Sequence, residues 1–125
     1  MAVSEEQRER LRTCLVEMLL EIRAAYLRNG ASPLKHWDQI QNRSLSAARR
    51  AGTADEWVTM LCRGLQLPSL SSSASSALLA LSHEAREAGQ RVCLDVVERD
   101  LTLLLAMARK IAEDRRDARQ EATHG

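Results

Sequence analysis

Aromatic side chains are nearly absent from this chain of 125 residues, which has no Phe, one Tyr (Tyr26) and two Trp (Trp37 and Trp57). Strands are enriched in aromatic and β-branched residues, so this scarcity argues against a β-sheet. Leu and Ala supply most of the apolar residues instead, and both favour helices. The composition therefore predicts an all-α protein.

The chain also lacks long apolar runs and the pattern of a signal peptide. Its longest apolar run, residues 103–108, is far shorter than the roughly 20 residues that a membrane span needs. The start of the chain is too polar and acidic for a signal peptide, because Ser4 and Glu5 follow closely on Met1. The three cysteines (Cys14, Cys62 and Cys93) are far apart and form no C-x-x-C pair. We therefore expect free thiols in a reducing compartment, and a cytoplasmic protein.

Groups that carry out chemistry are equally sparse. Metal sites need clustered His, Cys or carboxylate side chains, but His36, His83 and His124 are isolated from one another. The five glycines are scattered at the ends of predicted helices, so no glycine-rich phosphate loop is present. We expect no metal, no cofactor and no enzymatic activity. A catalytic site assembled across helices from Cys62 with His36 or His83 is a distant alternative.

Capping signals divide the chain into about five helices within a single domain, residues 1–125. Ser4 with Gln7, and Thr53 with Glu56, each form a capping box, and Ser32-Pro33 is a further start signal. The predicted helices run from Ser4 to Asn29, from Ser32 to Gly52, from Thr53 towards Pro68, from about Ala74 to Ala88, and from about Arg91 to Gln120. The serine-rich residues 69–76 are predicted to form an internal loop, and residues 121–125 a disordered tail.

The last predicted helix is the longest and carries an apolar stripe with alternating spacings of four and three residues. That stripe consists of Val97, Leu101, Leu104, Ala108 and Ile111. The spacing is typical of a packed helix seam. Further apolar residues make the middle of this helix apolar almost all round, so it either lies at the centre of the bundle or pairs with another chain.

Basic residues are almost all arginine: sixteen of eighteen. Arginine forms planar, bidentate contacts to phosphate or carboxylate, which lysine does not. The net charge is only +1, so binding to a polyanion would depend on a local patch. Residues 39–54 carry Arg43, Arg49 and Arg50 without any acidic residue. Arg43 and Arg50 are seven residues apart and therefore share a helix face.

The arginine-bearing segment allows two interpretations. Its helix can lie along a nucleic-acid backbone, with Asn42, Ser44 and Ser46 as additional donors, or its arginines can simply form a solvated face. The charge is polarised along the chain, since residues 31–68 have five basic and three acidic side chains and residues 69–100 have three and five. Trp37 and Trp57 are expected in the core rather than stacked on bases.

The charged end of the last helix offers a second basic patch. Arg115 and Arg116 lie there among acidic residues. Such mixed charges are more often a solvated surface whose side chains pair with one another.

A cytoplasmic, single-domain helical chain of this size, with arginines on helix faces and no catalytic groups, resembles the small subunits of multi-subunit (class 1) CRISPR effector complexes. The resemblance covers the whole chain in size and helix content. It implies a subunit present in several copies along a guide-RNA complex, contacting a nucleic-acid backbone. It places Arg43, Arg49, Arg50, Arg63, Arg115 and Arg116 on the nucleic-acid side.

Two functions follow from these observations. The first is a non-catalytic structural subunit of a nucleoprotein complex, which contacts nucleic-acid backbone through arginines and neighbouring subunits through apolar faces. With a net charge of +1, such a subunit is expected to bind nucleic acid weakly on its own. The alternative is a helical protein–protein adaptor or homo-oligomer with no role in nucleic-acid binding.

Overall fold

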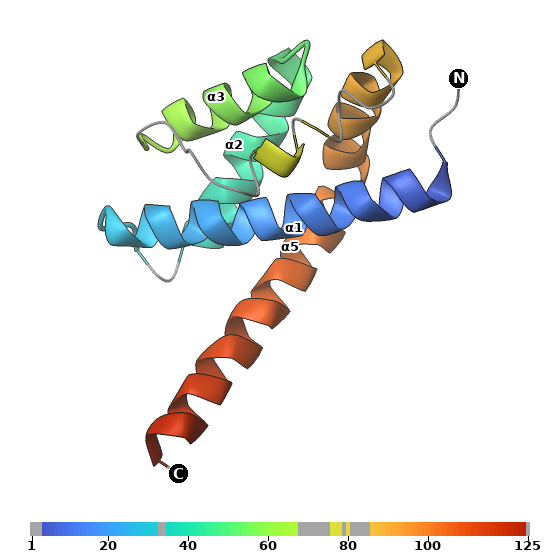
Figure 1. Cartoon of the computed structure of the whole chain (residues 1–125). Helices are drawn as coiled ribbons and strands as arrows, with labels where there is room; N and C mark the ends of the chain where they lie inside the picture. The colour runs from blue at the N-terminus through green and yellow to red at the C-terminus, as the bar shows by residue number, and fades with distance from the viewer. Residues whose placement is uncertain (1–3, 33–34, 68–75, 79, 81–85, 125) are drawn as a thin grey trace.

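The computed structural model describes residues 4–32, 35–67, 76–78, 80 and 86–124, and every regular element in these residues is helical (Figure 1). Four helices have defined bounds: α1 (Glu5–Arg28), α2 (His36–Arg50), α3 (Ala54–Gly64) and α5 (Arg86–His124). Residues 76–78 and 80 are also helical. The prediction of an all-α helical bundle with a long C-terminal helix is therefore confirmed.

Helix α5 organises the arrangement. It packs against both α1 and α2, and α2 in turn packs against α3. In Figure 1, α1 (blue) crosses α5, and α2 and α3 (green) lie on the same side of α1. The C-terminal part of α5 (red) extends beyond the other helices. No helix among the described residues is both long and apolar enough to cross a membrane.

The apolar stripe of α5 lies inside the chain's own core. Val97, Leu101, Leu104 and Ala108 are each at most 2% exposed, and Ile111 is half-buried. The stripe therefore contributes to the core formed by the helices of this chain.

Helix α1 begins and ends as its sequence predicts. The amide of Gln7 donates to Ser4 Oγ at 3.2 Å, and the amide of Ser4 donates to Gln7 Oε1 at 3.0 Å, which completes the capping box. At the other end Gly30 has a φ of +90°, and the amides of Gly30 and Ala31 donate to carbonyls of the last turn. This is a Schellman motif, in which glycine takes the left-handed position without strain.

Helix α2 begins later than predicted. The sequence suggested Ser32 as the N-cap, but the N-cap is Lys35, which makes no capping hydrogen bond through its side chain. The amide of Lys35 donates to the carbonyl of Ser32 at 3.3 Å, so Ser32 lies ahead of the N-cap.

Helix α5 is longer than predicted at both ends. It begins at Arg86 and continues through Gly89, which we expected to end the preceding helix. One glycine costs about 1 kcal/mol in a helix interior, which is too little to end a helix of this length. The helix also continues to His124, into the tail that we expected to be disordered. The predictions for residues 69–75 and for most of the fourth helix lie outside the described residues.

All three cysteines are buried and none forms a disulfide, as expected. Burial raises the pKa of Cys93 to about 12, and the nearby Cys14 contributes in the same direction. A thiol with this pKa is almost entirely protonated near neutral pH, so Cys93 acts as a small apolar core residue.

Helix α3 ends with a residue in a conformation that normally favours glycine. Gln66 has a φ of +57°. The amide of Gln66 donates to Arg63 O at 3.0 Å, and the amide of Leu67 donates to Cys62 O at 2.8 Å. These two hydrogen bonds form a second Schellman motif, with glutamine at the left-handed position. A residue with a Cβ pays about 1–2 kcal/mol for that conformation.

The strain at Gln66 predicts that Gln66→Gly stabilises the protein. We expect the free energy of unfolding to rise by about 0.5–1 kcal/mol, because relief of the strain exceeds the extra chain entropy of glycine. Urea denaturation followed by circular dichroism measures the change. The matched control is Gly30→Gln at the equivalent position after α1, which should destabilise the protein. A loss of stability in Gln66→Gly would contradict this account.

Candidate functional site

The structure separates the six arginines proposed to contact nucleic acid into two groups. Arg49 and Arg115 form ion pairs within the chain, with Glu98 at 3.5 Å and with Glu17 at 3.4 Å. The other four are exposed and form no ion pair among the described residues: Arg43, Arg50, Arg63 and Arg116. Both observed pairs are largely exposed to solvent, so each contributes little stability.

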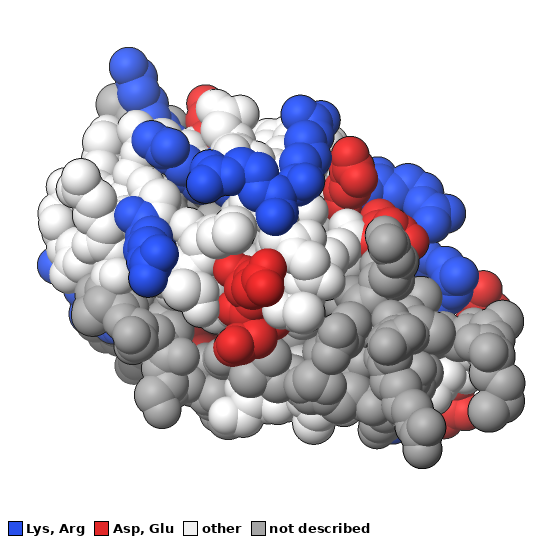
Figure 2. All heavy atoms as spheres, turned by 90° about the horizontal axis from the view of Figure 1, so that it is seen from above, with Lys and Arg blue, Asp and Glu red and all other residues white. Residues whose placement is uncertain are grey.

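Three of the unpaired arginines belong to neighbouring helices. Arg43 and Arg50 lie on α2, and Arg63 lies in the last turn of α3, which packs against α2. We call these three residues the arginine face. Arg116 is separate from them, towards the C-terminal end of α5. Seen from above Figure 1, Lys and Arg side chains gather in a band over the upper part of the surface (Figure 2).

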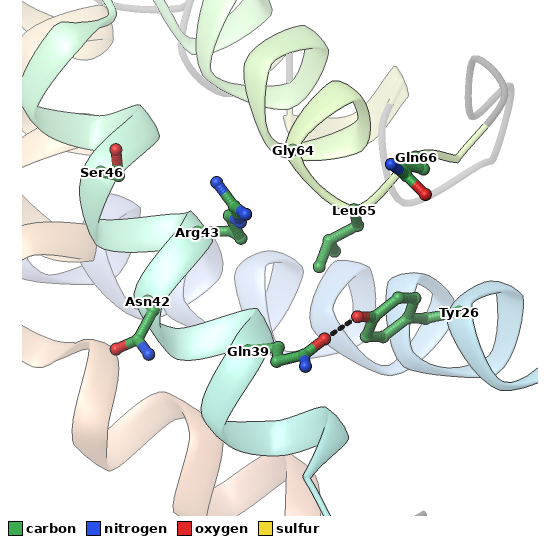
Figure 3. A pocket seen from close by; sticks show the side chains of 8 residues that line it. All are labelled: Tyr26, Gln39, Asn42, Arg43, Ser46, Gly64, Leu65 and Gln66. Carbon is green, nitrogen blue, oxygen red and sulfur yellow. Dashed lines mark hydrogen bonds between the residues drawn. The ribbon is translucent and has the colours of Figure 1, made fainter. Parts of the chain in front are cut away.

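A pocket of about 420 Å³ adjoins Arg43. Residues from α1, α2 and the end of α3 surround it (Figure 3): Tyr26, Gln39, Asn42, Arg43, Ser46, Gly64, Leu65 and Gln66. We call this the α2–α3 pocket. Its lining contains one cation, three side-chain amides and two hydroxyl groups, but no carboxylate. A lining of this kind suits an anionic ligand with additional hydrogen-bonding groups.

Gly64 allows Arg43 to lie close to α3. A Cβ added at position 64 would lie 3.1 Å from Arg43 Cδ and 3.6 Å from Arg43 Cγ. The aliphatic part of Arg43 therefore packs on the backbone of α3, while its guanidinium group stays at the pocket (Figure 3). This contact orients the arginine without neutralising its charge.

Tyr26 orients one of the amides in the pocket. Its hydroxyl donates to Gln39 Oε1, as Figure 3 shows. Since the amide oxygen faces Tyr26, the Nε2 donor of Gln39 is left for a ligand. Asn42 and Gln66 belong to the same lining, but in Figure 3 the side chain of Asn42 points away from Gln39 and Gln66 lies beyond Leu65.

Ser44 does not face the surface, contrary to its predicted role as a donor to nucleic acid. It is fully buried, and its carbonyl accepts a hydrogen bond of 3.1 Å from Trp57 Nε1. Trp57 is also fully buried, so it belongs to the core, as expected. The position of Ser44 follows from the period of α2, because Ile40, Ser44 and Ala48 lie on the buried face.

A second polar cluster lies at the beginning of α2. His36 is buried, and its Nε2 accepts a hydrogen bond of 3.1 Å from Arg23 Nε. The guanidinium group of Arg23 also lies 5.4 Å from the ring centroid of Trp37, within cation–π range. These contacts join α1 to α2. His36, named in the distant enzymatic alternative, thus has a structural partner.

For the α2–α3 pocket, the sequence analysis indicated the residues on α2 and not those on α1 and α3. Gln39, Asn42, Arg43 and Ser46 lie within the arginine-bearing segment. No sequence pattern marked Tyr26 or Gln66 as pocket residues, because they reach the pocket through the packing of α1 and α3 on α2. No cluster of His, Cys, Asp or Glu suited to a metal ion occurs in the described part of the chain.

Comparisons with protein-family models, with curated proteins and with solved structures found no match to this chain.

The buried hydroxyl of Ser44 gives a prediction about stability. Its Oγ has no hydrogen-bond partner among the described residues. We expect Ser44→Ala to raise the free energy of unfolding by about 1 kcal/mol, since it removes an unsatisfied buried group and introduces a better helix former. Chemical denaturation measures the change. The control Ser46→Ala, on the exposed side of α2, should change stability by less. A clear destabilisation by Ser44→Ala would show that its hydroxyl has a partner.

Proposed function

We propose that this protein is a non-catalytic structural subunit of a nucleoprotein complex, similar to the small subunits of CRISPR effector complexes. In this proposal the arginine face contacts the phosphates of a nucleic acid. Neighbouring subunits hold the protein in place, so each copy needs only a few phosphate contacts.

One observation carries the proposal: Arg43, Arg50 and Arg63 are exposed and unpaired within the described residues, and they lie on two helices that pack together. Acidic residues satisfy Arg49 and Arg115 elsewhere on the surface. An arginine without a carboxylate partner can give its bidentate contact to a phosphate at no cost in broken ion pairs. The absence of carboxylates from the adjoining pocket favours the same ligand.

Reversing the charge of the arginine face tests the proposal. The triple variant Arg43→Glu, Arg50→Glu, Arg63→Glu should abolish binding to labelled oligonucleotides at low salt, as measured by fluorescence anisotropy. For the wild type, the logarithm of the binding constant should fall with the logarithm of salt concentration, with a slope of about −2 for three phosphates on a single strand. The melting temperature should change little, because all three side chains are exposed.

The matched control reverses three exposed basic residues on α5: Arg99→Glu, Arg109→Glu, Lys110→Glu. It makes the same change in net charge at another site. If the control weakens nucleic-acid binding as much as the test variant does, binding depends on the net charge of the protein and not on the arginine face.

The adaptor alternative is supported by a separate observation. Leu103 is 57% exposed and Met107 is 44% exposed, and they lie one turn apart on the outer side of α5. Among the side chains that the structure describes, these two are the large apolar ones exposed to a protein neighbour. A subunit of a nucleoprotein complex also needs an apolar surface for its neighbours. The nucleoprotein subunit and the adaptor are therefore distinguished by the role of the arginine face and not by Leu103 and Met107.

Substitutions at exposed and buried positions of α5 distinguish an effect on assembly from an effect on folding. We expect Leu103→Glu with Met107→Glu to keep wild-type helicity and stability, because both side chains are exposed. Leu104→Glu, at a fully buried position, should destabilise the fold by about 3 kcal/mol or more. Sedimentation gives the mass of each variant. A fall in mass for the double variant, combined with unchanged nucleic-acid binding in the triple arginine variant, would favour the adaptor.

A further inference from the structure

We propose that the α2–α3 pocket holds one unpaired nucleotide, so that the arginine face binds single-stranded rather than duplex nucleic acid. This inference rests on the proposed function and specifies its ligand. It assigns the phosphate of the nucleotide to Arg43 and the edge of the base to the side-chain amide of Gln39.

The size of the pocket is the first argument. At about 420 Å³ it is larger than a single phosphate needs, and it falls within the range of about 300–1,000 Å³ that is usual for small-ligand sites. Backbone contacts alone need only a surface, because phosphates project from the nucleic acid. A hollow beside the cation has room for the group that is attached to the phosphate.

The chemistry of the lining is the second argument. Asn and Gln amides each combine a donor with an acceptor, and so match the edges of nucleobases. Gln39 is such a residue in the lining, beside Arg43, and Asn42, Ser46 and Gln66 complete the polar part of the lining. The hydrogen bond from Tyr26 fixes the orientation of the Gln39 amide before any ligand is present. Such a set of groups is more than a phosphate requires.

The position of Gln66 is the third argument. Its left-handed backbone places a glutamine where glycine would be more stable. Strained residues tend to occur at binding sites, where the side chain is needed despite its cost. Here the residue in the left-handed conformation, Gln66, belongs to the lining of the pocket.

A duplex does not fit this arrangement. Its bases are stacked and paired, so their hydrogen-bonding edges are used or lie in the grooves. In a single strand an unstacked base is free to enter a pocket beside its own phosphate. The site should therefore discriminate between single strands and duplexes, whereas an arginine face acting alone should favour the higher charge density of a duplex.

The test measures the anisotropy of labelled single-stranded RNA, single-stranded DNA and the corresponding duplexes with the purified protein. We expect the single strands to bind more tightly than their duplexes. Comparison of the two single strands shows whether the sugar matters, since the 2′-hydroxyl distinguishes RNA from DNA.

Variants of the pocket separate base contacts from phosphate contacts. Gln39→Leu should weaken single-strand binding about tenfold, as for one well-formed base contact, and leave the salt slope unchanged. Arg43→Gln should weaken binding and make the slope shallower by about 0.7, as for one lost phosphate contact. Tyr26→Phe should weaken binding without changing the slope. The matched control is Gln41→Leu, the same substitution on α2 outside the pocket lining, where Gln41 bonds Thr102 of α5.

The outcomes distinguish this inference from the proposed function. If duplexes bind as well as single strands and Gln39→Leu has no effect, while the triple arginine variant loses binding, the pocket is not a nucleotide site but the proposed function stands. If wild-type protein binds no oligonucleotide at low salt up to about 10⁻⁴ M, the weak end of non-specific binding, both are wrong. Circular dichroism of each variant excludes misfolding as the cause.

Discussion

The burial of one apolar stripe on α5 against α1 and α2 is the constraint on which the rest of the structure depends. Leu101, Leu104 and Ala108 leave almost no surface exposed, so α1 and α2 must both lie along this helix. Burying a leucine side chain contributes roughly 1.5–3 kcal/mol, far more than the exposed ion pairs between the same helices. The ion pair between Arg12 and Asp100, 3.3 Å apart, helps to orient α1 on α5 but contributes little to the free energy of folding.

The placement of the arginine face follows from that packing. Because Ile40, Ala47 and Ala48 lie on the buried face of α2, Arg43 and Arg50 are exposed. Arg43 also lies against Gly64 of α3. Arg49 lies nearer to α5 and pairs with Glu98. Three arginines that are close in sequence thus have different surroundings. Two acidic residues of the segment 69–100 pair with basic side chains of the neighbouring helices: Asp100 with Arg12 of α1, and Glu98 with Arg49 of α2.

Periodicity and capping residues predicted the helices well, but the sequence did not predict which residues of different helices contact one another. Ser4 with Gln7 gave the start of α1, and the buried positions of α5 followed its apolar spacing. The prediction that a helix ends at Gly89 was wrong, because the free-energy cost of one glycine is too small to interrupt a helix as long as α5. At the site, the sequence indicated Arg43 and its neighbours on α2. It gave no sign of Tyr26 or Gln66, because a pocket between three helices depends on how their ends meet.

The close contact of Gly64 with Arg43 has a consequence for how this chain can diverge. A Cβ at position 64 would lie only 3.1 Å from Arg43 Cδ, so the side chain at position 43 would have to shift to accommodate it. In descendants of this sequence the two positions should therefore change together, with a larger residue at 64 accompanying a shorter one at 43. If the charge of Arg43 is under selection, glycine should be conserved at position 64. Helix propensity alone would favour alanine there.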